Sequence, residues 1–530
     1  MKKHIIITLI LLAATAYVTV VYFKNLNPPG SRTSLVLSAI PDDAPLIFEF
    51  NNDKSFYDIF KDNKLFAAFI GAEKLGQLDT LRQALLQNRV LGKYFNGQDV
   101  FISLHPSKTE GISLLLTMSP ANGFEPEVFD DLLKQKNSGL VVTPMRAAGK
   151  SGYNIYISAL KKRFYLINKG NNVFSGSFSE ELANQSASHK NTPGGERFVL
   201  LSDQQNNNSL ANFYVNYNQL NPLFEELFKN KNTDIFKNFR MFPALAALSL
   251  NYRTDAIMFN GSTSVKKNER QSYLSIFTGQ QPVPNHLKEM FPSTTAYCTS
   301  FSVSNPQKFA ADLIKQQNNN NLDGERDDLF SKIKAETGVK IKNDFDGLLG
   351  NEFAIVTTRY FEKFGIVSVK DGSRLKVLLT AMSIMSDENT GQLSYEKLPS
   401  FLLGDAFNNF KRPYFMIIDN YLIFANSSNE LASYYDIYIN RKFLSKNEQF
   451  NQFDELLAAQ SNVSFFFHFK NALPVLERDM APGIYDDVKS LKPGWGDFYG
   501  ASVQLSAVDN NFYTNFCLKL NSDTTANKQK

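Results

Sequence analysis

Apolar and aromatic residues alternate with polar ones in short runs over most of the chain, which is the period-two pattern of half-buried β-strands. Two pairs of such runs, residues 164–167 with 173–174 and residues 414–418 with 421–424, are each separated by a turn rich in Gly, Asn or Asp. Turns of this composition favour hairpins. We therefore predict antiparallel hairpins at both places.

Helical spacing interrupts these strands. Leu75, Leu78, Leu81 and Leu85 fall on one helical face, while Gly338 follows a second periodic segment as a candidate C-cap. The predicted order is strand, helices, hairpin, helix, several strands, helix and a terminal meander. This order predicts an α+β fold with a mainly antiparallel sheet, and a β-sandwich is the alternative.

One uncharged run, Ile5 to Phe23, has the length of a membrane span: 19 residues, or about 28 Å as a helix. Lys2 and Lys3 precede it, which predicts a cytoplasmic N-terminus at residues 1–4 and an extracytoplasmic location for the rest of the chain. The alternative is a cleaved signal peptide with its site after Ala16. Because the apolar run continues past Ala16, we favour an uncleaved transmembrane anchor.

The segments at either end of the folded part are polar. Residues 24–34 contain two prolines and a glycine and predict a spacer, so that the fold begins near Leu35. Residues 521–530 predict a disordered tail.

The two halves of the chain match each other in four segments that occur in the same order. Pro41 matches Pro292 at an offset of 251, and Gly97 matches Gly350 at 253. Two further matches, Ser179 to Leu182 with Ser428 to Leu431 and an aromatic strand at 213–217 with 465–469, lie at offsets of 249 and 252. This regularity predicts two tandem copies of one domain.

The predicted boundary between the copies is a proline-rich segment. Residues 279–284 lack a long apolar run and are expected to be a linker. The first copy would then span residues 35–278 and the second residues 285–520.

Composition excludes several classes of protein. Hydrophobic residues make up 43% of the chain and charged residues 20%, which indicates folded domains rather than disorder. The net charge is +4, of which Lys2, Lys3 and Lys24 contribute most, so the remainder is nearly neutral. The sequence therefore has no electrostatic signature of nucleic-acid binding, and coiled coils and disulfide-rich miniproteins are also excluded.

No motif identifies a metal or cofactor. The five histidines are isolated, and we interpret His468 as a solvent-facing or hydrogen-bonded strand residue. Residues 319–324 imitate the start of a calcium loop, but position 12 is Phe330 rather than Glu. We expect an Asn-rich loop before a helix there, and neither metal nor cofactor.

No motif identifies an enzyme either. Four adjacent acidic pairs, Asp42-Asp43 among them, are interpreted as caps and solvated faces. Nucleophile-elbow and phosphate-loop signatures are absent from the sequence. Cys298 and Cys517, the two cysteines, are a possible disulfide in an oxidising compartment, and the alternative is two buried thiols.

Three segments carry a resemblance: the strand opening at Pro41 to Leu46 and the segments Gly97 to Asp99 and Gly350 to Glu352. In these segments the chain resembles an uncharacterised family of bacterial membrane-anchored extracytoplasmic proteins with a duplicated domain of unknown function. The resemblance would span residues 35 to 520 and implies architecture and location, without catalytic residues.

The sequence thus predicts a non-enzymatic binding, scaffolding or envelope-assembly protein, tethered by its N-terminal helix on the periplasmic side of the inner membrane. Its expected partners are the membrane and other envelope proteins or lipid. One alternative is a carrier or sensor of a hydrophobic ligand, which the abundance of Phe (46) and Tyr (22) suggests. The other is an envelope hydrolase built from residues distant in sequence.

Overall fold

The fold is described from a computed structural model. It describes residues 31–521, apart from 55, 58–67, 69–71, 108–110, 122–123, 126, 134–138, 191–208, 231–232, 236, 241, 267–271, 346 and 491–493. The predicted anchor at 5–23 lies outside the described residues, as does the predicted tail apart from Asn521. Among the described residues, no helix is both long and apolar enough to cross a bilayer.

The chain divides into two compact units. Unit 1 comprises residues 1–56, 80–105 and 113–212, and unit 2 comprises residues 57–79, 106–112 and 213–530. The division at residue 212 does not follow the predicted boundary at 279–284. The reason is that the strands after residue 212 pair with the end of the chain, as described below.

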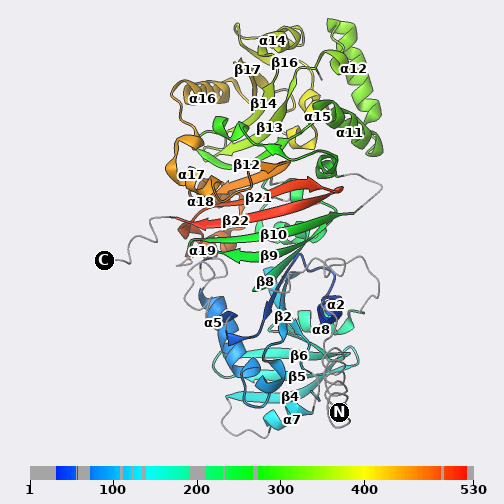
Figure 1. The fold of residues 1–530 in the computed structure, drawn as a ribbon, viewed down its shortest axis with the longest axis vertical. Helices are drawn as coiled ribbons and strands as arrows, with labels where there is room; N and C mark the ends of the chain where they lie inside the picture. The colour runs from blue at the N-terminus through cyan, green and yellow to red at the C-terminus, as the bar shows by residue number, and fades with distance from the viewer. Residues whose placement is uncertain are drawn as a thin grey trace, which may run out of the picture. The chain divides into compact units, whose positions relative to one another are not determined.

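Unit 1 contains a sheet with the strand order β1-β2-β3-β7-β6-β5-β4, in which the pairs β1–β2, β3–β7, β7–β6, β6–β5 and β5–β4 are antiparallel (Figure 1). The strands are β1 (Leu46–Asn51), β2 (Asp99–Ser107), β3 (Gly111–Met118), β4 (Leu140–Ala147), β5 (Lys150–Ile157), β6 (Lys162–Gly170) and β7 (Val173–Ser177).

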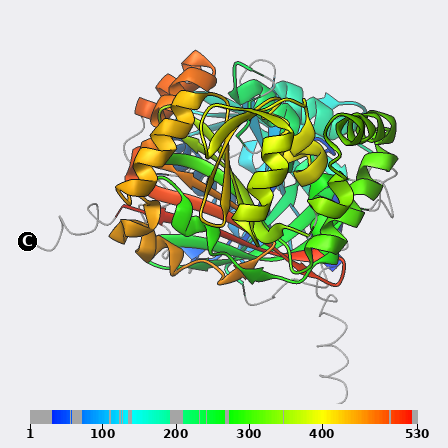
Figure 2. The ribbon, with the colours of Figure 1, turned by 90° about the horizontal axis from the view of Figure 1, so that it is seen from above.

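Unit 2 contains a longer antiparallel sheet with the order β9-β10-β22-β21-β20-β12-β13-β14-β18-β17-β16-β15. Its last hairpin, β21–β22, is red in Figures 1 and 2. The strands are β9 (Ala244–Tyr252), β10 (Ala256–Val265), β12 (Thr295–Ser302), β13 (Leu349–Thr358), β14 (Lys363–Val369), β15 (Ser383–Met385), β16 (Thr390–Leu393), β17 (Tyr414–Ile418), β18 (Tyr421–Ala425), β20 (Val463–His468), β21 (Phe498–Val508) and β22 (Asn511–Leu520). β8 (Ala211–Asn216) lies at the division between the units.

Helices separate these strands. The principal ones are α2 (Ser31–Ala39), α5 (Ala72–Leu81), the π-helix η1 (Arg82–Leu86), α6 (Gly92–Phe95), α7 (Val128–Leu133), α8 (Glu180–Ser188), α9 (Leu220–Leu227), α10 (Lys237–Arg240), α11 (Pro306–Asn319), α12 (Asp323–Thr337), α14 (Gly372–Ala381), α15 (Leu398–Leu403), α16 (Ser428–Ile439), α17 (Glu448–Asp454), α18 (Phe469–Asp479) and α19 (Pro482–Ser490). The predicted α+β class with an antiparallel sheet is confirmed.

Local signals place several helix ends. Asn305 accepts a hydrogen bond from Lys308 N, and Pro306 occupies the first turn of α11. α12 ends at Gly338, whose φ of 78° is left-handed, as the sequence predicts. α2 begins at Ser31, so the last four residues of the predicted spacer are helical instead.

The segment expected to be a linker is part of unit 2. Val283–Pro284 forms the short strand β11, which pairs with Gln460–Ser461 (β19). Gln280 is buried and its Oε1 accepts hydrogen bonds from Ser304 Oγ and Asn305 N. The prolines of this segment restrict its backbone without keeping it from packing.

The order of elements in unit 1 recurs in unit 2. Seven neighbouring strands of the unit 2 sheet follow each other in the same order as the seven strands of unit 1. The counterparts of β1, β2, β3, β7, β6, β5 and β4 are, in this order, β12, β13, β14, β18, β17, β16 and β15. The helices recur as well, because α7 precedes β4 as α14 precedes β15, and α8 follows β7 as α16 follows β18.

The core of unit 2 is rich in aromatic side chains. In unit 2, aromatic side chains that include Phe301, Phe353 and Phe407 stack against each other beside α11. A second apolar cluster on the same sheet includes both cysteines and Tyr434. Burial of these rings is the main stabilising term of unit 2.

The β9–β10 pairing has a testable weak point at Gly261. A Cβ added there would lie 2.1 Å from the carbonyl oxygen of Ala247 on β9. We expect Gly261→Ala to destabilise the protein by about 1–3 kcal/mol, because the strands must separate to admit the methyl group.

Urea unfolding followed by circular dichroism would measure this loss. The matched control is Gly324→Ala in α12, where an added Cβ meets nothing within 4 Å and alanine is the better helix former. Equal midpoints for the two variants would contradict the expectation.

Candidate functional site

A buried network of polar side chains connects three segments of unit 1. Nε2 of His105, on β2, lies 2.8 Å from Oγ of Ser103, two residues earlier on the same strand face. Nδ1 of His105 lies 2.8 Å from Oδ1 of Asp43, and Asp43 Oδ2 accepts a hydrogen bond from Gln185 Nε2 at 2.7 Å. Ser103 and His105 are buried, while Asp43 lies closer to solvent.

The electrostatics of Asp43 follow from these contacts. Burial alone would raise the pKa of Asp43, but the hydrogen bonds from His105 and Gln185 outweigh burial and lower it. Asp43 is therefore a carboxylate at neutral pH and fixes the orientation of the buried imidazole ring.

A second set of contacts satisfies the C-terminal ends of helices α8 and α2. The buried Lys169, on β6, donates to the carbonyl oxygens of Ser186 and His189 at the end of α8. His189 Nε2 lies 3.3 Å from the carbonyl oxygen of Ser38 in α2. Cationic and imidazole donors near a helix C-terminus interact favourably with its carbonyls; the Ser186 carbonyl also accepts the backbone N–H of His189.

Burial of Lys169 disfavours its charged form. Burial and then the charge of Lys150 lower its pKa to about 8. Burial, followed by the charge of Lys169, also lowers the pKa of His189. Residues Asp43, Ser103, His105, Lys169, Gln185 and His189, called the histidine cluster below, are the most densely connected polar group described in unit 1.

The Ser103–His105–Asp43 contacts reproduce the order of a hydrolase triad, but the location of Ser103 does not suit catalysis. A nucleophilic serine must be reachable by a substrate carbonyl, whereas Ser103 is 0% exposed in the middle of a strand. Its Oγ also lies 3.3 Å from the carbonyl oxygen of Leu115 on β3. The contacts therefore act as a structural link between β2 and the segment before β1.

Sequence reasoning missed this cluster. It assigned Asp43 to caps and solvated faces and treated His105 as an isolated residue. The alternation Ser103-Leu104-His105 within a strand is the one local signal, since it puts both side chains on the same face. Nothing local connects them with Asp43, 60 residues earlier.

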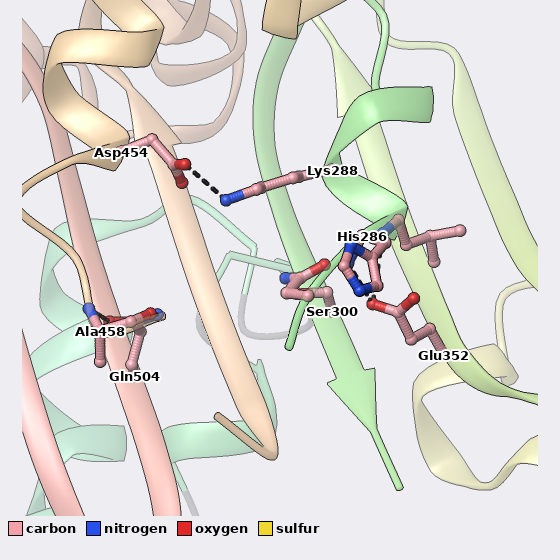
Figure 3. Close-up of polar contacts among 9 residues, drawn as sticks. His286, Lys288, Ser300, Glu352, Asp454, Ala458 and Gln504 are labelled. Atoms are coloured by element: carbon pink, nitrogen blue, oxygen red, sulfur yellow. Dashed lines mark hydrogen bonds and ion pairs between the residues drawn. The ribbon is translucent and has the colours of Figure 1, made fainter. Parts of the chain in front are cut away.

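In unit 2 the polar contacts surround the short helix η5 (Leu287–Met290) (Figure 3). Glu352 Oε1 accepts hydrogen bonds from the backbone N of His286 at 2.7 Å and of Leu287 at 3.2 Å. Burial raises the pKa of Glu352 despite these bonds. Lys288 pairs with Asp454 at the other side of the same turn.

These contacts explain the acidic motif seen in the sequence. Glu352 is the last residue of the segment Gly350 to Glu352, and it caps η5. Asp99 is the last residue of the segment Gly97 to Asp99, and it accepts a hydrogen bond from Asn51 Nδ2 at 3.0 Å. Asp99 thus has its partner on β1, the strand that β2 pairs with, whereas the partners of Glu352 lie at η5, ahead of β12.

From the sequence we interpret His468 as solvent-facing or hydrogen-bonded. In the structure His468 is hydrogen-bonded and buried, so it does not face solvent. Its Nδ1 accepts the backbone N–H of Asn471 at 3.1 Å and so caps α18. Burial lowers its pKa to about 4.

The prediction of a possible disulfide between Cys298 and Cys517 is wrong, and the alternative of two buried thiols holds. Both thiols are free and buried. Strands β20 and β21 separate β12 from β22, and the register leads from Cys298 through Phe466 and Ser502 to Cys517. Three strand spacings are roughly 14 Å, beyond the reach of a disulfide. Burial raises the pKa of both thiols, in Cys517 to about 12.

The calcium-like segment forms the end of α11, a short turn and the start of α12. The buried Arg326 side chain donates to Asn318 Oδ1 at 2.8 Å, which gives the Asn-rich stretch a structural partner. Within the part of the chain that the structure describes, no group of three or more His, Cys, Asp or Glu side chains is placed to hold a metal ion.

An apolar cavity of about 30 Å³ lies in unit 1 beside the π-helix η1. Its lining is apolar: Leu81, Leu85, Leu86, Leu91, Phe95, Leu116, Met118, Phe129, Phe164, Leu166 and Phe174. A void of this volume has room for about one water molecule or methyl group.

Comparisons with known proteins add no relative. A scan against protein families, a search of curated proteins and a search of solved structures each find no match to the chain.

Asp43 offers a test of the histidine cluster. Asp43→Ala leaves the buried His105 without its acceptor, so we expect a loss of about 1–3 kcal/mol in unfolding free energy at pH 7. Because the pKa of folded Asp43 is lowered, its contribution is present above the unfolded value near 3.9 and disappears as pH falls through the folded value.

Urea unfolding at pH 7 and pH 3 would therefore show a gap between wild type and variant that narrows in acid. Asp328→Ala, at an exposed position of α12, is the control, and its difference from wild type should change little between the two pH values. A gap of equal size at both pH values would refute the role of the carboxylate.

His468 predicts a second pH dependence. The folded pKa of about 4 lies below the unfolded value near 6.5, so stability from the neutral imidazole is present above pH 6.5 and is lost as pH falls toward 4. In His468→Asn, which keeps a capping side chain, we expect the decline in unfolding free energy between pH 7 and pH 5 to be smaller by on the order of 1–2 kcal/mol. Urea titrations at the two pH values measure this, and parallel declines would contradict it.

Proposed function

We propose that the protein is a membrane-tethered, extracytoplasmic binding or envelope-assembly protein built from two copies of one α+β domain. The observation that carries the duplicated architecture is the recurrence of one strand order in both units. A seven-strand order with its flanking helices is far more specific than fold class alone.

Strand register supports the same alignment. Asn51 pairs with Asp99 in β1–β2, and Ser302 pairs with Glu352 in β12–β13. Ser302 follows Asn51 by 251 residues, and Glu352 follows Asp99 by 253. These are the offsets that the sequence comparison gives for the two segments.

Reciprocal contacts support a two-fold relation between the copies. Lys229 N donates to Asp479 O at 2.8 Å, and Ala481 N donates to Leu227 O at 3.0 Å. A shift of 252 residues exchanges these two hydrogen bonds. Contacts that map onto themselves in this way are typical of the interface of a two-fold dimer.

The ends of the sheets explain why the copies and the compact units differ. β10 of the first copy pairs with β22 of the second, so the end of the first copy lies within unit 2. We therefore keep residues 35–278 and 285–520 as the proposed copies while describing the compact units separately.

Tethering and location rest on the apolar run Ile5 to Phe23 and on the lysines before it. The resemblance to membrane-anchored bacterial proteins with a duplicated domain agrees with them. Binding rather than catalysis is proposed because the triad-like contacts are buried at Ser103. The proposed partners are envelope proteins or lipid.

Affinity purification of the full chain from solubilised bacterial membranes tests this function. We expect the chain in the membrane fraction after an alkaline carbonate wash, with its C-terminal part accessible to protease in spheroplasts. Envelope proteins should co-purify with it. A soluble form that begins at Tyr17, or a protease-protected C-terminal part, would overturn the proposal.

A second candidate function, carriage of an apolar ligand, is favoured by the lining of the cavity beside η1. No polar residue is among its lining residues, and a π-helix often marks a functional position. Because the cavity holds about 30 Å³, a lipid would have to displace η1 to enter. Stoichiometric lipid in the same purification, without co-purified protein, would favour this candidate.

A further inference from the structure

The two faces of the β9-β10-β22-β21 sheet have opposite chemistry. Cross-strand partners share a face, and on one face Phe259 lies opposite Phe516 and beside Leu250, all in a buried or half-buried layer. The other face also carries apolar residues, of which Cys517 is buried and Met258 packs against the apolar cluster of unit 2. Its half-buried or exposed polar residues are Ser249, Asn251, Asn260, Ser262, Ser264, Ser506, Asn511, Tyr513 and Asn515, called the amide face below.

The amide face carries no charge at its accessible positions. The charged residue of these strands on this side, Lys519, is buried at the far end of β22. Charged residues make up 20% of the chain and are the usual occupants of an open sheet face. A sheet face whose accessible positions are mainly Asn and Ser, with Tyr513, Val508, Met258 and Ala247 beside them and no charged residue, is therefore unusual for a merely solvated surface. In Figure 1 the strands β9, β10 and β22 are seen side by side and face-on.

Hydrogen bonds hold the amides of this face in place. Asn251 Nδ2 donates to Asn260 Oδ1 at 3.0 Å, and Asn260 Nδ2 donates to Asn515 Oδ1. Asn260 and Asn515 are direct cross-strand partners. Fixed side chains lose little conformational freedom when a ligand binds, which lowers the cost of binding.

The chemistry of the amide face indicates the class of ligand. Absence of charge gives no attraction for nucleic acids or anionic lipid headgroups. Tyr513 at 44% and Val508 at 51% exposure are the large apolar side chains at its edge, too few for the apolar core of a protein interface. Amide and hydroxyl groups both donate and accept hydrogen bonds, which matches a neutral polyhydroxylated ligand, and a Tyr ring offers a surface on which a sugar ring can stack.

We propose that the amide face binds a neutral polysaccharide strand, with Asn260 and Asn515 at its centre and Tyr513 as the stacking residue. This proposal rests on the proposed extracytoplasmic location in one respect: the location brings the protein into contact with such a polymer. Binding can thus be tested on the purified chain, and its failure would leave membrane tethering untouched.

The test is retention of the full chain on insoluble chitin and on cellulose, in a detergent without a sugar headgroup. We expect retention on at least one of the two, with little change between 0.15 M and 1 M NaCl, because no ion pair is involved. Tyr513→Ala and Ser262→Lys should each lower retention at least tenfold. Tyr360→Ala, which removes an exposed tyrosine at the β13–β14 hairpin, is the matched control and should bind as wild type.

Three results would overturn the proposal. They are no retention on either polymer, retention that 1 M NaCl abolishes, and face variants that bind as well as the control. Thermal unfolding of each variant shows that it is folded before binding is compared. A dimer in sedimentation experiments that Tyr513→Ala dissociates would assign the face to a second copy of the chain instead.

Discussion

The antiparallel ladder between β10 and β22 is the interaction on which the arrangement of residues 213–530 depends. It runs from Ala256 opposite Lys519 to Thr263 opposite Phe512. Without this ladder, the β9–β10 hairpin would not be joined to the β21–β22 hairpin. An isolated hairpin is only marginally stable in water. The ladder joins residues more than 240 positions apart, and it therefore couples the stability of the two hairpins.

The ladder also determines which chemistry faces solvent. Register fixes the side of every residue in a strand, and a slip by one position would expose Phe259 and bury Asn260. The hydroxyls of Thr263 and Thr514, 2.6 Å apart on the buried side, add a hydrogen bond that a slipped register would lose. The buried face thus specifies the register, and the register leaves an uncharged amide surface on the other side.

The sequence predicted the fold class and the helix end at Gly338, because each depends on local periodicity or on turn chemistry. It did not predict the division at residue 212, since pairing between β10 and β22 leaves no local signature. For the same reason it misjudged Cys298 and Cys517, which lie on strands of one sheet but with two strands between them. The histidine cluster was out of reach because Asp43 and His105 meet only through tertiary packing.

Under the proposed duplication, a feature that occurs in only one of the two copies is not required by the fold. Counted from the N-cap serines Ser179 and Ser427, Ser186 on α8 and Tyr434 on α16 are both the seventh residue, an alignment that differs by one position from the sequence match of Ser179 with Ser428. Tyr434 fills its site with a buried ring whose hydroxyl donates to Met290 O at 3.0 Å. At the corresponding place in unit 1, the carbonyl of Ser186 accepts from the buried Lys169.

Unit 2 thus buries an aromatic ring on α16, whereas unit 1 buries a cation against the end of α8, and a buried cation is costly to desolvate. Ser103 also has no polar counterpart, because the residue at the offset of 253 is the buried Val356. Since one copy is built without these polar groups, sheet packing alone does not account for the histidine cluster. Its other contacts, to Ser38 in α2 and through Asp43 to the segment before β1, join the first described helix of the chain to the sheet. In a tethered protein this is the segment nearest the predicted anchor, where any pull from the membrane would first reach the fold.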